Sequence, residues 1–397
     1  MQASPVTGKH VQESLLTRDR VVAMHNRLHD SGQAARSIPW GKLELRVCPD
    51  SGLIFNAAFD PSLVEYDATY DSTVPSAASE AYCRELASFL LREFTLPADA
   101  LVIEAGCGKG EFLEMLLAAA PSLRGLGMDP SCPAERQEGR LHLIPDYFKP
   151  EKVPSGAALV ICRHVMDQMT DPLAFVRQVA ALAESNLGCQ LFIEVRDFRG
   201  MLAAGAFWDL CYENHCYFTE ESLSHLLGAV GFEIVCQGRG LEGQYLWMGA
   251  KLGSRVSRTE GAAVARIAAD LTEFARREIE SIEAIRGEMR KLKASGRKII
   301  VWGAATKGVN YITNVDPDAV LIDFATDINA RRHGSYVAGS GHEVIAPQEI
   351  ASRAGDSPAI VVMNPSYMDE IFEQCMQMGL RPQMLDALMN AKALPTT

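Results

Sequence analysis

Three closely spaced glycines follow a short apolar run and could form a loop that binds a cofactor. The run Leu101–Glu104 predicts a strand, and Gly106, Gly108 and Gly110 come immediately after it. Glycines allow the chain to turn tightly and a ligand to approach the backbone, and the following apolar residues predict a helix whose N-terminus faces the loop. A second apolar run ends in Asp129, whose carboxylate could accept hydrogen bonds from ribose hydroxyls. The spacing therefore predicts a nucleotide-type cofactor site.

The order of residues in this loop distinguishes two cofactor classes. A dinucleotide site has the spacing GxGxxG, whereas this chain has GxGxG preceded by an acid, Glu104. The loop resembles the first motif of class I S-adenosylmethionine (SAM) methyltransferases, in which Glu104 would suit the ammonium group of SAM better than it would a pyrophosphate. In this interpretation Cys107 contributes to the cofactor loop as a small apolar residue. A dinucleotide and a purely structural turn are the alternatives.

Later strands of the same predicted sheet end in further polar residues that could contact this cofactor. Leu141–Ile144 leads to Asp146, and the resemblance implies that an acid at this position contacts the adenine amino group. Ala158–Cys162 leads to Arg163 and His164, which we expect at the mouth where cofactor and substrate meet. Ordinary loop polarity would also explain the last two residues.

A polar and aromatic segment, Trp208–Thr219, carries the residues most suited to acid–base chemistry. It reads WDLCYENHCYFT and resembles the Tyr-His-Glu-His signature of nucleotide-sugar C-methyltransferases, such as the TDP-deoxysugar 3-C-methyltransferases. Tyr212 and His215 match the outer positions of the signature, while Glu213 and Asn214 replace its His-Glu order. The resemblance therefore implies a methyltransferase with an altered acid–base set. Ordinary residues that lead into a helix are the alternative.

Methyl transfer to carbon suggests a role for each of these residues. If the acceptor carbon lies next to a carbonyl, a base must remove a proton to give an enolate. His215 is the predicted base, and we expect Tyr212 and Glu213 to orient it or to hold the substrate. Asn214 is expected to contact the substrate. If the acceptor is a hydroxyl or an amine, His215 could deprotonate that group directly.

The N-terminal part resembles the same family but departs from it in its metal ligands. Residues 48–71 resemble the end of the family's zinc module and the segment that closes over SAM, which includes Tyr70. The family holds zinc with cysteine pairs, of which only Cys48 remains here. His25 and His29 would share a face if their segment were helical, but zinc needs four ligands. We therefore expect no zinc.

Two segments further along the chain are expected to contact the substrate. Gln244 and Tyr245 lie in a stretch that resembles a family loop near the substrate. Residues 303–367 resemble parts of the family's C-terminal sugar-side domain, where Lys307 would lie at a helix N-terminus suited to an anion. A solvated lysine at a turn explains Lys307 equally well. The same domain supplies three further candidates, Asp327, Asn329 and His342.

Alternating apolar strands and amphipathic helices must position all of these residues. The alternation runs from about residue 76 to 253 and resumes after residue 297, with one long amphipathic helix over about 260–294 between the two stretches. The predicted class is α/β, with a class I Rossmann-like methyltransferase domain, a second C-terminal Rossmann-like domain and a small N-terminal lid. The expected parts are the lid over 1–75, the SAM-binding domain over 76–255, the connecting helix over 256–296 and the C-terminal substrate domain over 297–397.

Composition and charge exclude several classes of function. The 397 residues carry 38 Lys+Arg against 50 Asp+Glu, a formal net charge of -12, which argues against a nucleic-acid binder that relies on a basic face. No apolar run approaches the roughly 18 residues that suggest a membrane span, and the N-terminal stretch lacks the apolar core of a signal peptide. Ten scattered cysteines without a CxxC pair favour reduced thiols in the cytoplasm.

Together these observations predict a cytoplasmic SAM-dependent methyltransferase that releases S-adenosylhomocysteine and acts as a monomer or homodimer. Its partner would be a small molecule, which could be nucleotide-linked, rather than a nucleic acid or a membrane. C-methylation in secondary or sugar metabolism, such as antibiotic biosynthesis, is the expected reaction. O- or N-methylation of a non-sugar natural product, a NAD-dependent oxidoreductase and a non-catalytic SAM-binding protein are the alternatives.

Overall fold

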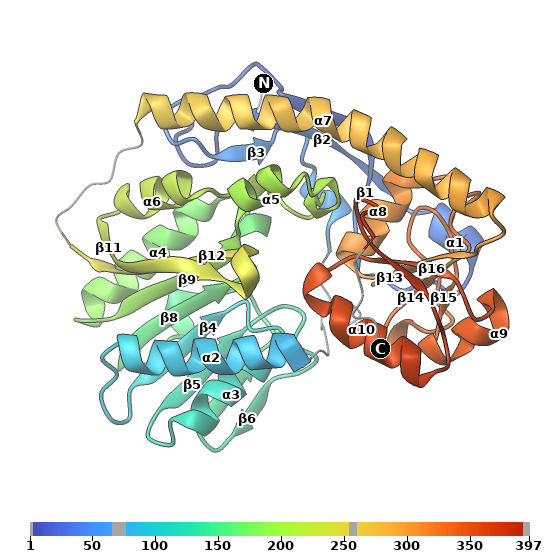
Figure 1. Ribbon diagram of the computed structural model, residues 1–397. Helices are drawn as coiled ribbons and strands as arrows, with labels where there is room; N and C mark the ends of the chain where they lie inside the picture. The colour runs from blue at the N-terminus through green and yellow to red at the C-terminus, as the bar shows by residue number, and fades with distance from the viewer. Residues whose placement is uncertain (1–2, 66–76, 254–259, 392–397) are drawn as a thin grey trace.

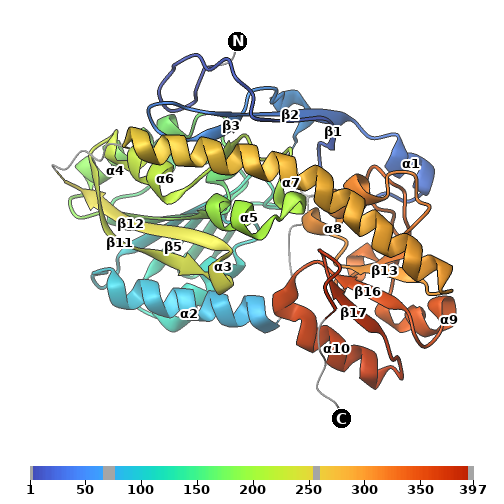
Figure 2. The ribbon, with the colours of Figure 1, turned by 45° about the horizontal axis from the view of Figure 1, so that its top comes forward.

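The computed structural model describes residues 3–65, 77–253 and 260–391 and arranges them around three β-sheets (Figure 1). Two lobes, each a sheet with helices packed against it, lie side by side. The long helix α7 (Gly261–Ala294) passes over both lobes (Figures 1 and 2). In the described part of the chain, neither α7 nor another helix is long and apolar enough to cross a membrane. The predicted α/β class is confirmed.

The larger lobe contains an eight-stranded sheet in the order β11-β12-β9-β8-β4-β5-β7-β6, of which the five central strands are parallel. The strands are β4 (Leu101–Ala105), β5 (Arg124–Met128), β6 (Arg136–Glu138), β7 (Leu141–Ile144), β8 (Ala157–Arg163), β9 (Gln190–Arg196), β11 (Phe232–Gly240) and β12 (Tyr245–Leu252). Helices pack on both faces, α2 (Ala77–Glu93) and α3 (Glu111–Ala119) on one, and α4 (Pro172–Ser185) and α6 (Glu220–Gly228) on the other. Every residue of β4 is buried because parallel sheets are covered on both faces.

One segment predicted as a loop is a strand. Tyr245 begins β12, which pairs antiparallel with both β9 and β11. The turn lies just before it, at Leu241–Gly243, where Leu241 and Glu242 have φ of 44° and 54°. The prediction of a loop was wrong for Tyr245. The turn glycines suggested a longer loop than the chain forms, whereas the buried residues that hold β12 in the sheet begin at Leu246.

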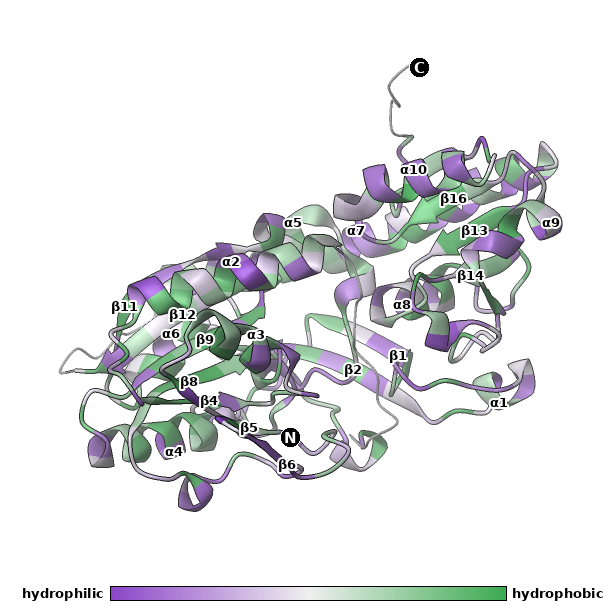
Figure 3. Ribbon diagram, turned by 90° about the horizontal axis from the view of Figure 1, so that it is seen from below, coloured by the Kyte–Doolittle hydropathy of each residue, from purple (hydrophilic) through white to green (hydrophobic). Residues whose placement is uncertain are grey.

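The smaller lobe contains a five-stranded parallel sheet in the order β15-β14-β13-β16-β17, which is a doubly wound arrangement. Its strands are β13 (Ile299–Trp302), β14 (Phe324–Thr326), β15 (Val344–Ile345), β16 (Ala359–Val362) and β17 (Gln383–Asp386). Its helices are α8 (Thr306–Val315), α9 (Ile350–Ala354) and α10 (Met368–Gln377). Figure 3 shows β13 and β16 as mainly hydrophobic strands, while α10 carries both hydrophobic and hydrophilic residues. The second Rossmann-like unit is thus also as predicted.

The N-terminal residues form a four-stranded antiparallel sheet that includes a strand from the larger lobe. β1 (Leu16–Val22), β2 (Trp40–Val47) and β3 (Ile54–Asn56) are joined by β10 (Cys216–Tyr217), which pairs with β3. The short helix α1 (Gly32–Arg36) connects β1 and β2 along the chain. Because His215 immediately precedes β10, the N-terminal sheet holds the segment that carries the predicted base.

A single hydrophobic core joins the N-terminal sheet, α7 and the smaller lobe. Phe207, Trp208 and Tyr212 lie in this core between α5 (Phe198–Ala204) and β10, and they are buried together with residues of β1, β2, α7 and α8. Burial of such large apolar side chains contributes roughly 25 cal/mol per Å² of surface removed from water. The segment that leads to His215 is therefore packed by elements from three parts of the chain.

Candidate functional site

The glycine loop adopts backbone conformations that suit glycine. Gly106, Gly108 and Gly110 have φ of 80°, 54° and 88°. A Cβ atom at Gly106 would lie 2.2 Å from Cγ2 of Val165, so the loop can approach the turn after β8 only with glycine there. A Cβ atom at Gly108 would meet open space, and Cys107 is buried beneath the loop. The backbone at Gly108 can therefore approach a ligand.

Glu104, the penultimate residue of β4, is a buried acid with one oxygen that no described group pairs. The residue is 3% exposed, and its Oε2 has no hydrogen-bond partner among the described groups. Burial raises the pKa of Glu104 to about 7, although the charge of Arg163 opposes this shift. A cation placed against Oε2 would remove the cost of this buried, unpaired oxygen. The residues present thus fit the ammonium group of SAM.

The other two acids are placed where the sequence predicted, after β5 and β7. Asp129 accepts a hydrogen bond from the Gly108 amide on Oδ2 at 2.9 Å and two from Ser131 on Oδ1. It therefore fixes the glycine loop and lies against it. Asp146 contacts the ammonium groups of Lys149 and Lys152 at 2.7 Å, and these hydrogen bonds lower its pKa. An adenine amino group would have to share Asp146 with two lysines.

Arg163 and His164 are paired with Glu194 of β9, a residue that sequence reasoning missed. Arg163 Nε and His164 Nε2 each lie 2.9 Å from Oε1 of Glu194, and the Tyr82 hydroxyl donates to Oε2. Burial alone would raise the pKa of Glu194, but the charges of Arg163 and His164 lower it to about 2. The Arg163 guanidinium also lies 4.1 Å from the centre of the Phe112 ring. Arg163 and Glu194 thus form a buried ion pair beside the glycine loop, and the partly exposed His164 ring joins it.

His215 lies at the same edge of the sheet as the glycine loop. Gly106 packs on Val165, and four residues later the Met169 carbonyl oxygen lies 3.3 Å from His215 Nδ1. A carbonyl only accepts, so Nδ1 carries the proton and Nε2 is the basic nitrogen. Among the described residues no group hydrogen-bonds Nε2. Burial lowers the pKa of His215, so its ring is neutral at neutral pH.

The aromatic ring of Phe59 separates His215 from Tyr212. Its centre is 5.1 Å from that of His215 and 5.4 Å from that of Tyr212, onto which it stacks. The Tyr212 hydroxyl accepts a hydrogen bond from the Asp60 amide at 2.8 Å. Tyr212 is fully buried, and a Cβ atom at Gly41 would lie 2.2 Å from its ring. Tyr212 therefore packs against Phe59, and Phe59 in turn packs against His215.

Replacing Tyr212 with phenylalanine is expected to reduce stability more than chemistry. The variant leaves the Asp60 amide without its acceptor, which costs about 1–2 kcal/mol. We expect a Tm lower by several degrees, measured by thermal denaturation, and a kcat within about tenfold of the wild type. Tyr147→Phe, at a side chain that is 64% exposed, is the matched control and should change neither quantity. Loss of all activity in a stable Tyr212→Phe protein would instead make the hydroxyl a catalytic group.

Glu213 and Asn214, which lie between Tyr212 and His215 in the chain, are also buried. Glu213 Oε1 accepts a hydrogen bond from the His25 amide at 2.7 Å and lies 3.3 Å from His25 Nδ1. Asn214 is 6% exposed, and its backbone amide donates to the Cys211 carbonyl at 3.2 Å. The structure therefore places Glu213 against His25 of the N-terminal part.

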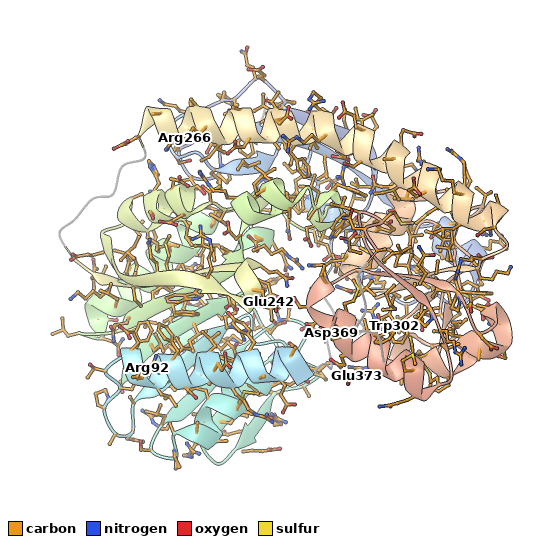
Figure 4. All side chains as sticks on the ribbon, in the orientation of Figure 1. Arg92, Glu242, Arg266, Trp302, Asp369 and Glu373 are labelled. Carbon is orange, nitrogen blue, oxygen red and sulfur yellow. The ribbon has the colours of Figure 1, made fainter. Side chains whose placement is uncertain are left out.

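The predicted substrate residues Gln244 and Lys307 meet across the two lobes. Lys307 Nζ donates to Gln244 Oε1 at 2.9 Å and lies 3.5 Å from Oδ2 of Asp209. Lys307 is the second residue of α8 and therefore lies at a helix N-terminus, as the sequence predicted. Tyr245 packs on the ring of His164, with centres 4.3 Å apart. Figure 4 shows Glu242 on the side of the larger lobe that faces Asp369 of α10.

The remaining predicted residues serve the smaller lobe itself or cannot be placed. Asp327 accepts a hydrogen bond from the Ala304 amide at 2.8 Å and a second from Asn329. His342 is buried between Ser340 and Asp316. These contacts hold the loops of the smaller sheet together. Tyr70 lies outside the described residues.

The contacts give no support for a metal centre. In the described ranges no group of three or more His, Cys, Asp and Glu side chains could hold a metal ion. Cys48 is buried with its sulfur 3.2 Å from the Thr7 hydroxyl, and His25 faces Glu213 and Asn310 instead of Cys48.

Asp167 is a second buried acid that sequence reasoning missed. It lies in the turn after β8, is 4% exposed, and its Oδ1 has no hydrogen-bond partner among the described groups. Its Oδ2 receives only a long hydrogen bond, 3.4 Å, from the Arg196 amide. Burial raises the pKa of Asp167 to about 7. Its position three residues after His164, in the same turn, was the signal that could have identified it.

Two family models match most of the described chain. Residues 76–237 match a methyltransferase domain, and residues 252–381 match the C-terminal domain of C-methyltransferases. The prediction of a methyltransferase domain in the larger lobe is thereby confirmed. The second match coincides with α7 and the smaller lobe. No curated protein matches this sequence.

The solved structures to which this chain is similar are distant from it in sequence. An N,N-8-amino-8-demethyl-D-riboflavin dimethyltransferase from Streptomyces davawensis is 18% identical, with a TM-score of 0.34 over 44% of this chain and 54% of that one. A mitomycin 7-O-methyltransferase is 15% identical, with a TM-score of 0.35 over 45% and 55% of the two chains. The chain thus spans about half the length of these two proteins.

Proposed function

We propose that this chain, which carries a methyltransferase domain and a C-methyltransferase C-terminal domain, transfers a methyl group from SAM to a carbon atom of a small molecule. The observation that carries the proposal is the neutral His215 ring at the sheet edge that holds the glycine loop, where its basic Nε2 has no hydrogen-bond partner among the described residues. The C-terminal family match supports carbon as the acceptor atom. A nucleotide-linked sugar or a related metabolite is the proposed substrate class.

Glu104, the glycine loop and Asp129 are the residues that would hold the cofactor. SAM supplies an electrophilic methyl group and leaves as the neutral thioether S-adenosylhomocysteine. Glu104 Oε2 would bind its ammonium group, and Asp129 would face its ribose from the end of β5. The Arg163–Glu194–His164 network keeps the neighbouring turn in place, because a buried ion pair loses much stability when one partner is removed.

His215 would act as the general base. Nε2 takes the proton from a carbon next to a carbonyl, and the electron pair of that C–H bond forms the enolate. As the new carbon–carbon bond forms, the carbonyl is restored, and the proton stays on the imidazole until solvent removes it. Met169 and Phe59 keep the ring in the orientation that directs Nε2 to the acceptor, which is a task of proximity.

We further propose a division of the chain into four working parts. Residues 1–75 cover the active site, 76–255 bind SAM, 256–296 connect the lobes, and 297–397 bind the substrate with Lys307 and Gln244. Lys307 lies at the N-terminus of α8, where partial positive charge favours an anionic group of the substrate. The cytoplasmic location and the monomeric or dimeric state stay predictions.

The cofactor class can be tested by thermal denaturation with SAM, S-adenosylhomocysteine and NAD. A ligand present at 100 times its Kd stabilises a protein by about 2.7 kcal/mol. We expect both SAM and S-adenosylhomocysteine to raise Tm by several degrees and NAD to leave it unchanged. Stabilisation by NAD alone would overturn the proposal in favour of an oxidoreductase.

A further inference from the structure

We infer that His25 is a positioning residue of the active site, which holds Glu213 in a buried charged pair and so fixes the segment that ends at His215. The inference rests on the proposed role of His215. It concerns a residue of the N-terminal part, which lies far from the catalytic segment in sequence and joins it only in the fold.

The His25 side chain is enclosed by groups from two other parts of the chain. Its exposed fraction is 1%, and those of Glu213 and Asn310 are 3% and 1%. Nδ1 lies 3.3 Å from Glu213 Oε1, which also accepts the His25 amide at 2.7 Å. Nε2 lies 2.8 Å from Oδ1 of Asn310, a residue of α8 in the smaller lobe. His25 therefore connects the N-terminal part with both lobes.

The partners of Asn310 determine where the protons of His25 lie. Asn310 Nδ2 donates to the carbonyl oxygens of Trp208 and Leu210, both at 3.1 Å, so the amide must direct Oδ1 at His25. His25 Nε2 must then donate and carries a proton. An ionised Glu213 also only accepts, so its pairing with His25 places a proton on Nδ1 too. The geometry thus makes His25 an imidazolium paired with a glutamate, with no lone pair free for a metal.

Arg18 and Asn310 also hold the segment between α5 and β10 in place. Arg18 of β1 donates from Nη2 to the Phe207 carbonyl at 2.9 Å and from Nε to Glu278 of α7 at 2.8 Å. Trp208 and Leu210 are held by Asn310, and Glu213 is held by His25. The segment has little regular structure of its own between α5 and β10, so its position depends on these donors. His215 lies two residues after Glu213, so its position depends on the same donors.

Replacement of His25 by glutamine tests the positioning role. The variant keeps a polar side chain of similar length but cannot carry the positive charge. We expect kcat to fall at least tenfold, while KM and the affinity for S-adenosylhomocysteine change less than threefold. His142→Gln is the matched control, because His142 pairs with Glu135 at 2.8 Å on the surface, and it should leave kcat unchanged. Unchanged kcat in a folded His25→Gln protein would overturn the inference.

Two further measurements do not depend on activity. Histidine-selective ¹⁵N NMR of the wild type should show protons on both ring nitrogens of His25 at pH 7.5, and Glu213→Gln should leave one. Backbone hydrogen exchange over residues 211–215 should accelerate at least tenfold in His25→Gln and not in His142→Gln. A singly protonated His25 in the wild type would contradict the inference even if His25→Gln did not fold, and unchanged exchange in a folded His25→Gln protein would contradict it as well. If the pair is present but no methyl group is ever transferred, the proposed function fails and the pairing stands.

Discussion

His215→Asn is expected to lower kcat by roughly 10²–10⁴-fold, which is the usual contribution of a general base. Asparagine can still meet the Met169 carbonyl and pack on Phe59, so the fold and cofactor affinity should persist. The measurement is the rate of methyl transfer from SAM to the native acceptor, with binding of S-adenosylhomocysteine by calorimetry alongside it. His142→Asn, at a half-buried histidine that pairs with Glu135, should leave the rate unchanged.

The pH dependence of the same rate provides a second readout of His215. A base must be unprotonated, and burial lowers the pKa of His215 from its ordinary value of 6.5. The wild-type kcat should therefore rise with pH and reach half of its maximum below pH 6.5. In His215→Ala, added imidazole should restore part of the rate. Full activity in His215→Asn would remove the base from the mechanism.

Glu104→Gln is expected to weaken binding of SAM and S-adenosylhomocysteine about 10- to 100-fold. The variant removes the charge opposite the ammonium group, and hydrogen bonds to charged groups are worth about 1.5–3 kcal/mol. Titration calorimetry with S-adenosylhomocysteine measures the effect. The control is Glu114→Gln, which removes an exposed carboxylate of α3 that pairs with Arg136, and it should bind normally. Equal affinity in Glu104→Gln would place the ammonium group elsewhere.

The same variant should stabilise the protein without ligand at high pH. The pKa of Glu104 is about 7 in the fold against an ordinary value of 4.5, so the native state binds the proton more tightly than the unfolded state. Stability from this group therefore falls as the pH rises from 4.5 to about 7, by roughly 3 kcal/mol at 1.36 kcal/mol per unit. Glu104→Gln should have the higher Tm at pH 8, no advantage at pH 4.5, and the lower Tm when S-adenosylhomocysteine is present.

The local part of the cofactor site could be predicted from the sequence. Glu104, the glycines and Asp129 lie within one strand–loop–helix–strand unit, so their spacing alone places them at one sheet edge. The helix α7 and the second Rossmann-like unit were also predictable, because hydrophobic periodicity is a local property of the sequence.

The long-range partners could not be predicted, because pairing between distant segments leaves no local signal. Glu194 meets Arg163 across two neighbouring strands, and it reads as an ordinary strand residue in the sequence. β10 joins the N-terminal sheet, and His25 meets Glu213 across 188 positions of the chain. From the sequence, the spacing of His25 and His29 could suggest only a pair of metal ligands. In the inferred arrangement His25 instead forms a charged pair with Glu213.

The acceptor atom provides the most direct test of the proposed function. The small molecule captured from the protein should first be identified by mass spectrometry. The protein should then be incubated with this molecule and with SAM that carries a ¹³C-labelled methyl group, and the product should be examined by carbon NMR. We predict a methyl carbon bonded to carbon, formed by the wild type and not by His215→Asn. A methyl group bonded to oxygen or nitrogen, or a C-methyl product formed equally well by His215→Asn, would contradict the proposal.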